Sequence, residues 1–205
     1  MRLLIATTNP SKVREIRLAL DGAPVEICTL ADIAPIAEPE ETGLTFAENA
    51  LQKARYYAAH AGLPTVAEDS GLAIDALGGA PGVLSARYPG DTYAIKFANL
   101  YRELAPHPRP WTARFVCSLA FVDDVAGLKS GPTFACEATV EGEIAAAPKG
   151  EHGFGYDPIF FYPPYGKTLG EATDAEKLTV SHRGRAFELF KAWLARTTQP
   201  KSLRE

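Results

Sequence analysis

The stretch Leu-Leu-Ile-Ala-Thr-Thr-Asn-Pro-Ser-Lys, residues 3–12, decides how the chain begins to fold. Its first four residues are apolar and predict a short buried strand. Asn9 is a suitable helix N-cap, and Pro10 would take the first helical position, where a missing N–H has no cost. Apolar residues then recur at helical spacing up to Leu20. A strand, a tight turn and a helix in this order can receive an anion on backbone N–H groups and the positive end of the helix dipole.

Outward from this stretch, helical and strand patterns alternate in the first half of the chain, and paired strands dominate the middle. This order predicts an α/β protein with a mixed sheet, divided into two lobes with a cleft between them. Strands are expected at 25–30, 65–74, 113–122 and 133–144, with a turn near Gly127, and helices at 45–62, at 94–104 and from about 173 and 181.

Composition limits the kinds of partner that the protein can have. The formal net charge of -4 over 205 residues argues against holding nucleic acid by bulk electrostatics. No run approaches the roughly 20 apolar residues that span a membrane. The three cysteines show no CxxC spacing, which suits reduced thiols. We therefore expect a cytoplasmic protein without membrane or nucleic-acid partners, forming one domain over residues 1–205 with a polar tail from about Thr197.

The first candidate site is the turn itself. Hydroxyls, helix-terminal amides and a lysine within one turn suit a polyphosphate, and they are supplied by Thr7, Thr8, Asn9, Pro10, Ser11 and Lys12. The segment lacks the P-loop spacing. A well-capped helix with a solvated lysine is the alternative.

The second candidate is a set of acidic residues: Glu38, Glu40, Glu41, Glu68, Asp69 and Asp75. The most informative group is Glu68-Asp69-Ser70-Gly71, because acids at the end of a buried strand, followed by glycine, often lie at the mouth of a cleft. Mg²⁺ takes such oxygen ligands, with one or two carboxylates beside substrate phosphates. A remaining carboxylate can activate water. For any single acid, a solvated surface position is the alternative.

Two later segments have the residues that a nucleobase site needs. In 153–158 (Gly-Phe-Gly-Tyr-Asp-Pro), glycines flank Phe154, whose face can stack on a base. Ser181 as N-cap would place His182 and Arg183 in a first helical turn, where the dipole disfavours cations, and this local cost suggests an anionic or carbonyl-rich partner. Core aromatics and a solvated basic turn are the alternatives.

Taken in order, these motifs resemble the inosine triphosphate pyrophosphatase family, in its bacterial dITP/XTP pyrophosphatase branch. The resemblance runs from Leu3 to about Leu194. It rests on the segments 6–12, 40–50, 68–72, 78–82, 85–88, 153–158 and 181–184.

The resemblance implies an elongated α/β fold with a long mixed sheet flanked by helices, two lobes and a central substrate cleft, assembled as a homodimer. It implies Mg²⁺-dependent hydrolysis of non-canonical purine nucleoside triphosphates (dITP/ITP, dXTP/XTP) to a monophosphate and pyrophosphate. A pyrophosphatase for other modified nucleotides and a non-catalytic nucleotide-binding protein are the alternatives.

The same resemblance implies a role for each site residue. Asp69 would be the general base and a metal ligand, with Glu40 or Glu41 as the second metal carboxylate. The triphosphate would lie along Thr7 to Lys12 and Lys53, with Ser70 as a further contact. The base and sugar would be held by Phe154, Gly155, Tyr156 and Asp157, and the purine edge would be reached by Lys177, His182 and Arg183.

Two positions depart from the family pattern. Thr8 stands where the family often has glycine, so the turn before Asn9 is expected to be less permissive. Glu68 stands where the family commonly has aspartate, and its longer side chain could change how a metal is shared with Asp69.

Overall fold

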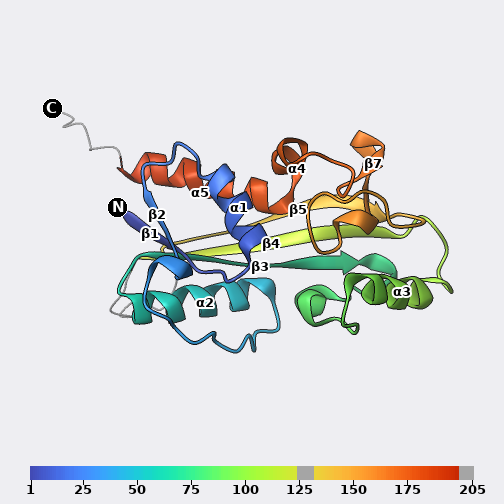
Figure 1. The fold of residues 1–205 in the computed structure, drawn as a ribbon, viewed down its shortest axis with the longest axis horizontal. Helices are drawn as coiled ribbons and strands as arrows, with labels where there is room; N and C mark the ends of the chain where they lie inside the picture. The colour runs from blue at the N-terminus through green and yellow to red at the C-terminus, as the bar shows by residue number, and fades with distance from the viewer. Residues whose placement is uncertain (124–131, 199–205) are drawn as a thin grey trace.

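The computed structural model describes residues 1–123 and 132–198 (Figure 1). These residues form a mixed seven-stranded sheet in the order β2-β1-β3-β4-β5-β6-β7, in which β1 is parallel to both its neighbours and the other pairs are antiparallel. The strands are β1 Arg2–Ile5, β2 Glu26–Thr29, β3 Thr65–Ile74, β4 Thr112–Val122, β5 Phe134–Ile144, β6 Phe160–Tyr162 and β7 Lys167–Thr168. The predicted α/β class with a mixed sheet is confirmed.

Helices cover both faces of this sheet. They are α1 Pro10–Ala19, α2 Phe46–Ala61, α3 Tyr93–Leu104, α4 Asp174–Val180 and α5 His182–Thr198. Figure 1 shows α2 and α3 end to end along one face, and α1, α4 and α5 along the other. The long strands β3, β4 and β5 run between these layers through most of the length of the molecule, which gives it the expected elongated shape.

The helix starts follow the sequence signals closely. The Asn9 side chain accepts hydrogen bonds from the backbone N–H groups of Ser11 at 2.9 Å and Lys12 at 3.2 Å, so α1 begins at Pro10 as predicted. Thr45 and Thr173 each form a complete capping box at the start of α2 and α4. The Ser181 hydroxyl accepts from the Gly184 N–H at 3.0 Å and caps α5.

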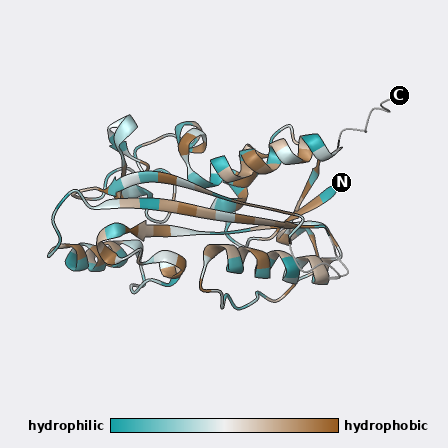
Figure 2. Ribbon diagram, turned by 180° about the vertical axis from the view of Figure 1, so that it is seen from behind, coloured by the Kyte–Doolittle hydropathy of each residue, from teal (hydrophilic) through white to brown (hydrophobic). Residues whose placement is uncertain are grey.

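Three groups of buried side chains divide the molecule along its long axis. In one half, β1 and the adjoining parts of β3 and β4 carry two clusters: one under α1 and α5, centred on Phe187 and Phe190, and one under α2 that includes Ala54 and Tyr57. The third cluster fills the other half between α3 and the far ends of the long strands. Figure 2 shows the corresponding hydrophobic positions on the helices and strands. The site lies where these halves meet.

A few boundaries differ from the prediction. Strand β2 is shorter at both ends than 25–30, and α5 continues through Thr198, past the expected start of the tail. The turn predicted near Gly127 and the rest of the tail lie outside the described residues. Within those residues, no helix combines the length and apolar character needed to cross a membrane.

Candidate functional site

The site begins at β3, where neighbouring acids point to opposite faces of the sheet because side chains alternate along a strand. Glu68 faces α1 and α5, with its carboxylate 2.8 Å from Lys12 Nζ and 3.5 Å from Arg183 Nη2. Asp69 faces α2, where Asn49 Nδ2 donates to its Oδ2 at 3.0 Å and Lys53 Nζ lies 3.5 Å from its Oδ1. Glu68 therefore forms ion pairs under α1, and its carboxylate lies on the opposite face of the sheet from that of Asp69.

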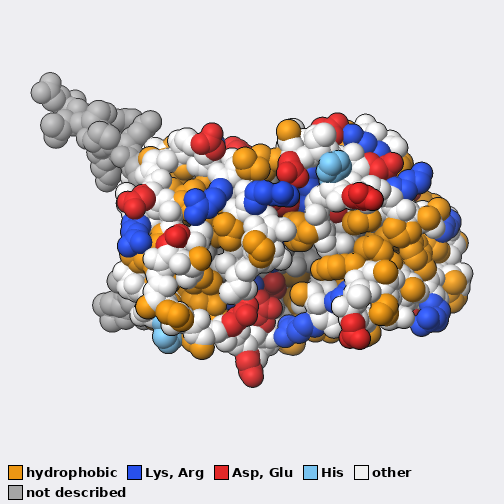
Figure 3. All heavy atoms as spheres, viewed as in Figure 1, with side chains coloured by type: hydrophobic (Ala, Val, Ile, Leu, Met, Phe, Trp, Pro, Cys, Tyr) orange, Lys and Arg blue, Asp and Glu red, His pale blue; other side chains and the backbone are white. Residues whose placement is uncertain are grey.

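A cavity opens beside Asp69, between the loop before α2 and the turn before α1. It contains charged groups of both signs, and its walls are formed by Ala6, Thr7, Thr8, Asn9, Lys12, Glu38, Pro39, Glu40, Glu41, Lys53, Tyr57, Asp69, Ser70, Val83, Ala86 and Arg87. We call it the charged cavity. Figure 3 shows acidic side chains gathered near the middle of the molecule with basic side chains beside them.

The ionisation of this cavity is set by burial and by close ion pairs. Asp69 is 6% exposed, and burial raises the pKa of its carboxyl, although Lys53 and the Asn49 hydrogen bond oppose the rise. Burial works against the charge of Lys53, yet Asp69, Glu68 and Glu41 together raise its pKa. Glu41 Oε1 lies 2.5 Å from Lys53 Nζ. The site thus holds the Asp69 carboxyl, whose raised pKa makes it a better proton acceptor, beside Lys53, whose raised pKa keeps it charged.

A second cavity adjoins the first on the side of α4 and α5. We call it the aromatic cavity, and its walls are formed by Asn9, Lys12, Ser70, Gly71, Ser85, Ala86, Tyr93, Phe115, Phe154, Gly155, Tyr156, Asp157, Lys177, His182 and Arg183. The two cavities share Asn9, Lys12, Ser70 and Ala86. A ligand with an anionic end and a flat aromatic end could therefore lie across both.

The ring of Phe154 has cations close to its face. Lys177 Nζ lies 4.5 Å and Arg183 Cζ 5.4 Å from its centroid. Such contacts are attractive because the ring face carries negative charge. Phe154 is half-buried in the wall, where it could also stack on a planar ligand.

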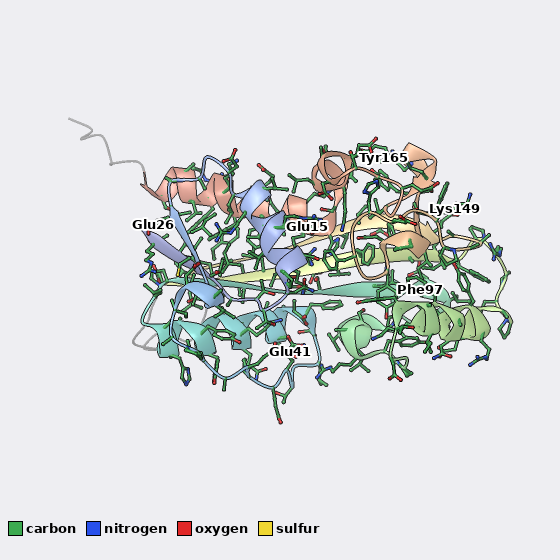
Figure 4. The ribbon with its side chains drawn as sticks, viewed as in Figure 1. Glu15, Glu26, Glu41, Phe97, Lys149 and Tyr165 are labelled. Carbon is green, nitrogen blue, oxygen red and sulfur yellow. The ribbon has the colours of Figure 1, made fainter. Side chains whose placement is uncertain are left out.

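Glu15 of α1, which the sequence reasoning missed, holds these cations in place. Its two carboxylate oxygens accept from Lys177 Nζ at 2.7 Å and Arg183 Nη1 at 2.6 Å. Burial opposes its ionisation, but Arg183 and Lys177 keep its pKa below the usual value. The helix that begins beside the charged cavity therefore also positions the basic wall of the aromatic cavity. Figure 4 labels Glu15 and Glu41 on opposite sides of the sheet, both near the middle of the long axis.

His182 and Arg183 form the floor of the aromatic cavity. The His182 ring stacks on Phe115 at 4.9 Å between centroids, and burial holds its pKa well below 6.5. Arg183 Nη2 donates to Ser70 Oγ at 2.8 Å. Among the described residues, His182 Nδ1 and Arg183 Nε are buried polar atoms with no hydrogen-bond partner. Unsatisfied groups of this kind call for an explanation, and a ligand could supply the partner.

Tyr156 and Asp157 support the cavity mainly from behind. The Tyr156 hydroxyl donates to the Ser85 carbonyl at 2.8 Å, so its ring rather than its hydroxyl faces the ligand space. Asp157 Oδ2 accepts from the Phe154 N–H at 2.7 Å and from Lys177 Nζ at 2.6 Å. Asp157 therefore fixes the loop that presents Phe154.

The structure does not bring every predicted residue to the site. Pro10 and Ser11 line neither cavity; they form the start of α1, and their predicted contact with the triphosphate stays a prediction. Asp75 lies at the far end of β3, where its carboxylate pairs with Arg114 at 3.1 Å, away from the other acids. Among the polar lining residues, reasoning from sequence gave no site role to Tyr57, Ser85, Arg87 and Tyr93, although Ser85 and Arg87 belong to the segment 85–88 of the resemblance.

The structure bears on the departure expected at Thr8 and on the expected Mg²⁺ site. Among the described residues, none other than glycine has a positive φ, so Thr8 fits its turn without that strain. No group of three or more His, Cys, Asp or Glu in the same residues is arranged to hold a metal ion alone. Glu40, Glu41 and Asp69 nonetheless line one cavity, and their oxygens fit Mg²⁺, which binds through one or two carboxylates plus substrate phosphates.

Comparison with known proteins agrees with this arrangement. The sequence profile of the Ham1 family matches residues 3–193. A dITP/XTP pyrophosphatase of Syntrophobacter fumaroxidans is 46% identical over an alignment of 211 positions, which covers 98% of this chain and 88% of the relative.

Solved structures show the same fold. A HAM1 protein from Coxiella burnetii superposes with a TM-score of 0.87 at 38% identity, covering 96% of this chain and 99% of that one. A nucleoside-triphosphatase, dITP/XTP pyrophosphatase, from Mycobacterium abscessus gives a TM-score of 0.73 at 41% identity, covering 93% and 98%.

Proposed function

Because the chain belongs to the Ham1 family, we propose that its two adjoining cavities hydrolyse non-canonical purine nucleoside triphosphates (dITP/ITP and dXTP/XTP) to a nucleoside monophosphate and pyrophosphate. It is a nucleoside triphosphate pyrophosphatase of the kind named for its relatives. One observation carries the proposal: the charged cavity, with Lys12 and Lys53, and the aromatic cavity, with Phe154 and Arg183, share four lining residues, Asn9, Lys12, Ser70 and Ala86.

The triphosphate would lie in the charged cavity, against the hydroxyls of Thr7 and Thr8 and the N-terminal end of α1. Lys12 and Lys53 would neutralise charge on the phosphate oxygens, which is the main demand of phosphoryl transfer. Ser70 lies between the cavities, where it could contact the α-phosphate.

Asp69 is our choice for the general base. Its carboxylate is held on Oδ2 by Asn49 and on Oδ1 by the Ser70 N–H at 3.1 Å, so its orientation is fixed before substrate arrives. It would accept a proton from the water that attacks the α-phosphorus in line with the leaving pyrophosphate. Burial raises the pKa of this carboxyl, which makes it a better proton acceptor than an exposed aspartate.

We propose that Asp69 and Glu40 or Glu41 also hold Mg²⁺ with the substrate phosphates. The ion would supply positive charge against the phosphate oxygens. Glu40 is exposed at the mouth of the charged cavity, whereas Glu41 lies deeper and is paired with Lys53. The Glu40 carboxylate could therefore bind Mg²⁺ directly, whereas Glu41 could bind it only after its ion pair with Lys53 breaks.

Selectivity for the base would come from donors at the far end of the aromatic cavity. A 6-keto oxygen would accept hydrogen bonds from Arg183 or His182. The 6-amino group of adenine is itself a donor, so it could not pair with these donors. Arg183 Nε lacks a partner in the protein, which supports this assignment. Leaving a buried polar group unpaired costs about 1–3 kcal/mol, enough to disfavour the wrong base.

A product analysis tests the proposal. The protein is incubated with dITP, XTP, ATP, dUTP or 5-methyl-UTP, with Mg²⁺ or with EDTA, and the products are followed by ³¹P NMR. We expect equal amounts of monophosphate and pyrophosphate from dITP and XTP, only with Mg²⁺. Preference for a pyrimidine substrate would identify a pyrophosphatase for other modified nucleotides. Nucleotide binding without turnover would identify a non-catalytic binding protein.

We further propose a cytoplasmic homodimer, on the resemblance of the chain to its family and on its ordinary, slightly acidic composition. Sedimentation at micromolar concentration should give twice the 22.1 kDa mass of one chain. A single species at the monomer mass would contradict the assembly while leaving the reaction untouched.

A further inference from the structure

Arg87 is a cation of the charged cavity that the proposed reaction has not yet used. Three described cations line this cavity: Lys12, Lys53 and Arg87. Lys12 Nζ is 2.8 Å from Glu68, and Lys53 Nζ is 2.5 Å from Glu41. Arg87 Nη2 reaches Glu41 Oε2 only at 3.9 Å, and its side chain is 53% exposed. An ion pair this long and this exposed contributes little, so the guanidinium can change partners readily.

The backbone that carries Arg87 is held firmly. Arg87 ends the 3₁₀ helix η3, Gly82–Arg87. Ser85 Oγ accepts from the Leu72 N–H at 2.9 Å and donates to the Gly82 carbonyl at 2.6 Å. Lys96 Nζ donates to the Ala86 carbonyl at 2.6 Å. The helix is thus fixed against β3 at Leu72, three residues beyond Asp69, and only the side chain of Arg87 needs to move.

Glu41 occupies the space between two cations. One oxygen contacts Lys53 and the other faces Arg87, so the carboxylate is the anion that these groups share in the absence of a ligand. A polyphosphate entering the cavity offers them more charge. The guanidinium fork also matches phosphate oxygens with paired hydrogen bonds, which an ammonium group cannot do.

We propose that Arg87 binds the diphosphate leaving group of the substrate, exchanging Glu41 for the β- and γ-phosphate oxygens. In the reaction, a water oxygen bonds to the α-phosphorus and its proton passes to Asp69. The bond from the α-phosphorus to the bridging oxygen breaks, and its electron pair stays on the diphosphate. Arg87 lines the same cavity and would bind that charge, and the movement of its guanidinium away from Glu41 releases one oxygen of that carboxylate.

Direct binding of inorganic pyrophosphate tests this inference, which rests on the proposed function. Calorimetry compares the wild-type protein with Arg87→Ala and Arg87→Lys, using pyrophosphate, the α,β-methylene analogue of dITP, and IMP as probes. We expect Arg87→Ala to weaken pyrophosphate and the analogue by about 10- to 100-fold, the scale of a hydrogen-bonded charge pair. IMP affinity should be unchanged, and Arg87→Lys should recover only part of the loss because it lacks the fork.

Arg55→Ala is the matched control, because Arg55 is an exposed arginine of α2 that lines neither cavity. It should bind all three probes as the wild type does. Equal pyrophosphate affinity in Arg87→Ala and wild type, with thermal unfolding unchanged, would overturn the inference. A parallel loss of IMP affinity would overturn it too, since Arg87 would then act on the whole site. Wild-type protein that fails to hydrolyse dITP would instead reject the proposed function.

Discussion

Asn49 joins two parts of the site that are distant in sequence. Its side chain is fully buried; the amide nitrogen donates to Asp69 Oδ2, and its oxygen accepts from the Gly43 N–H at 2.7 Å. Gly43 belongs to the loop that carries Glu40 and Glu41. One asparagine therefore orients the proposed base and anchors the loop that carries the proposed metal carboxylates.

The variant Asn49→Ala should lose both functions of this residue. We expect kcat with dITP to fall about 10-fold, because Asp69 loses the donor that orients it. The free energy of unfolding should drop by about 1–3 kcal/mol, the cost of leaving a buried partner unsatisfied. Steady-state kinetics and urea unfolding measure the two effects. Asn99→Ala is the control, since Asn99 of α3 lines neither cavity and its side chain bonds only to the Pro89 carbonyl and to Arg102. Normal kcat in Asn49→Ala would reject the positioning role.

At the scale of elements, the contact between β3 and η3 brings the two halves of the site together. Gly71 of β3 lies so close to η3 that a Cβ there would be 2.4 Å from Ser85 Oγ and 2.5 Å from the Gly82 carbonyl oxygen. Side chains do not tolerate such distances. The strand that carries Asp69 can therefore approach the segment that carries Arg87 only with glycine at position 71.

The variant Gly71→Ala should force these elements apart. We expect a loss of about 1–3 kcal/mol in the free energy of unfolding, the usual cost of overpacking, together with reduced turnover of dITP. The double variant with Ser85→Ala should not recover stability, because the Gly82 carbonyl remains in the way. Urea unfolding of both variants gives the comparison. A Gly71→Ala protein as stable as the wild type would show that η3 can move freely.

Elements with local signals were predictable from sequence, and contacts across the sheet were not. The capping residues Asn9, Thr45 and Thr173 mark helix starts because each bonds to backbone groups within its own turn. Asp69 and Arg183 stood out in short motifs. Glu15 lies in no such motif, and Arg87, although part of the segment 85–88, was given no role, because their partners lie far along the chain or across the cavity. The resemblance to a family supplied most of the site that local patterns alone left open.

At the scale of the whole molecule, buried charges connect the two cavities under the sheet. Arg183 contacts Glu15 and Glu68, and Lys12 contacts Glu68 in turn. Burial opposes the ionisation of Glu68, but Arg183 and Lys12 hold its pKa well below the usual value. His182, next to this network, is buried in its neutral form, with its pKa lowered by burial and by the Arg183 charge.

The contribution of His182 to stability should therefore decline on mild acidification. Above pH 6.5, His182 is neutral in both the folded and the unfolded chain. Below it, only the unfolded chain binds the proton until the pH reaches the lowered pKa of the folded state. The free energy of unfolding should then fall by up to about 1.4 kcal/mol per pH unit from this residue. Glu15 and Glu68 add to the loss only below their ordinary value of 4.5.

Urea unfolding between pH 7.5 and 5 checks this dependence. His182→Gln should show a shallower slope than the wild type. His152→Gln, which changes an exposed histidine, should keep the wild-type slope. Equal slopes in the wild type and His182→Gln would mean that His182 takes up its proton in the folded state as readily as in the unfolded one.

The most direct test concerns Asp69 itself. The variant Asp69→Asn keeps the size of the side chain but removes the proton acceptor and one negative charge. Turnover of dITP with Mg²⁺ should fall at least about 10²-fold, the usual scale for a general base, while calorimetry still detects binding of IMP. Near-normal turnover in Asp69→Asn would contradict the assignment of Asp69 as the hydrolytic carboxylate.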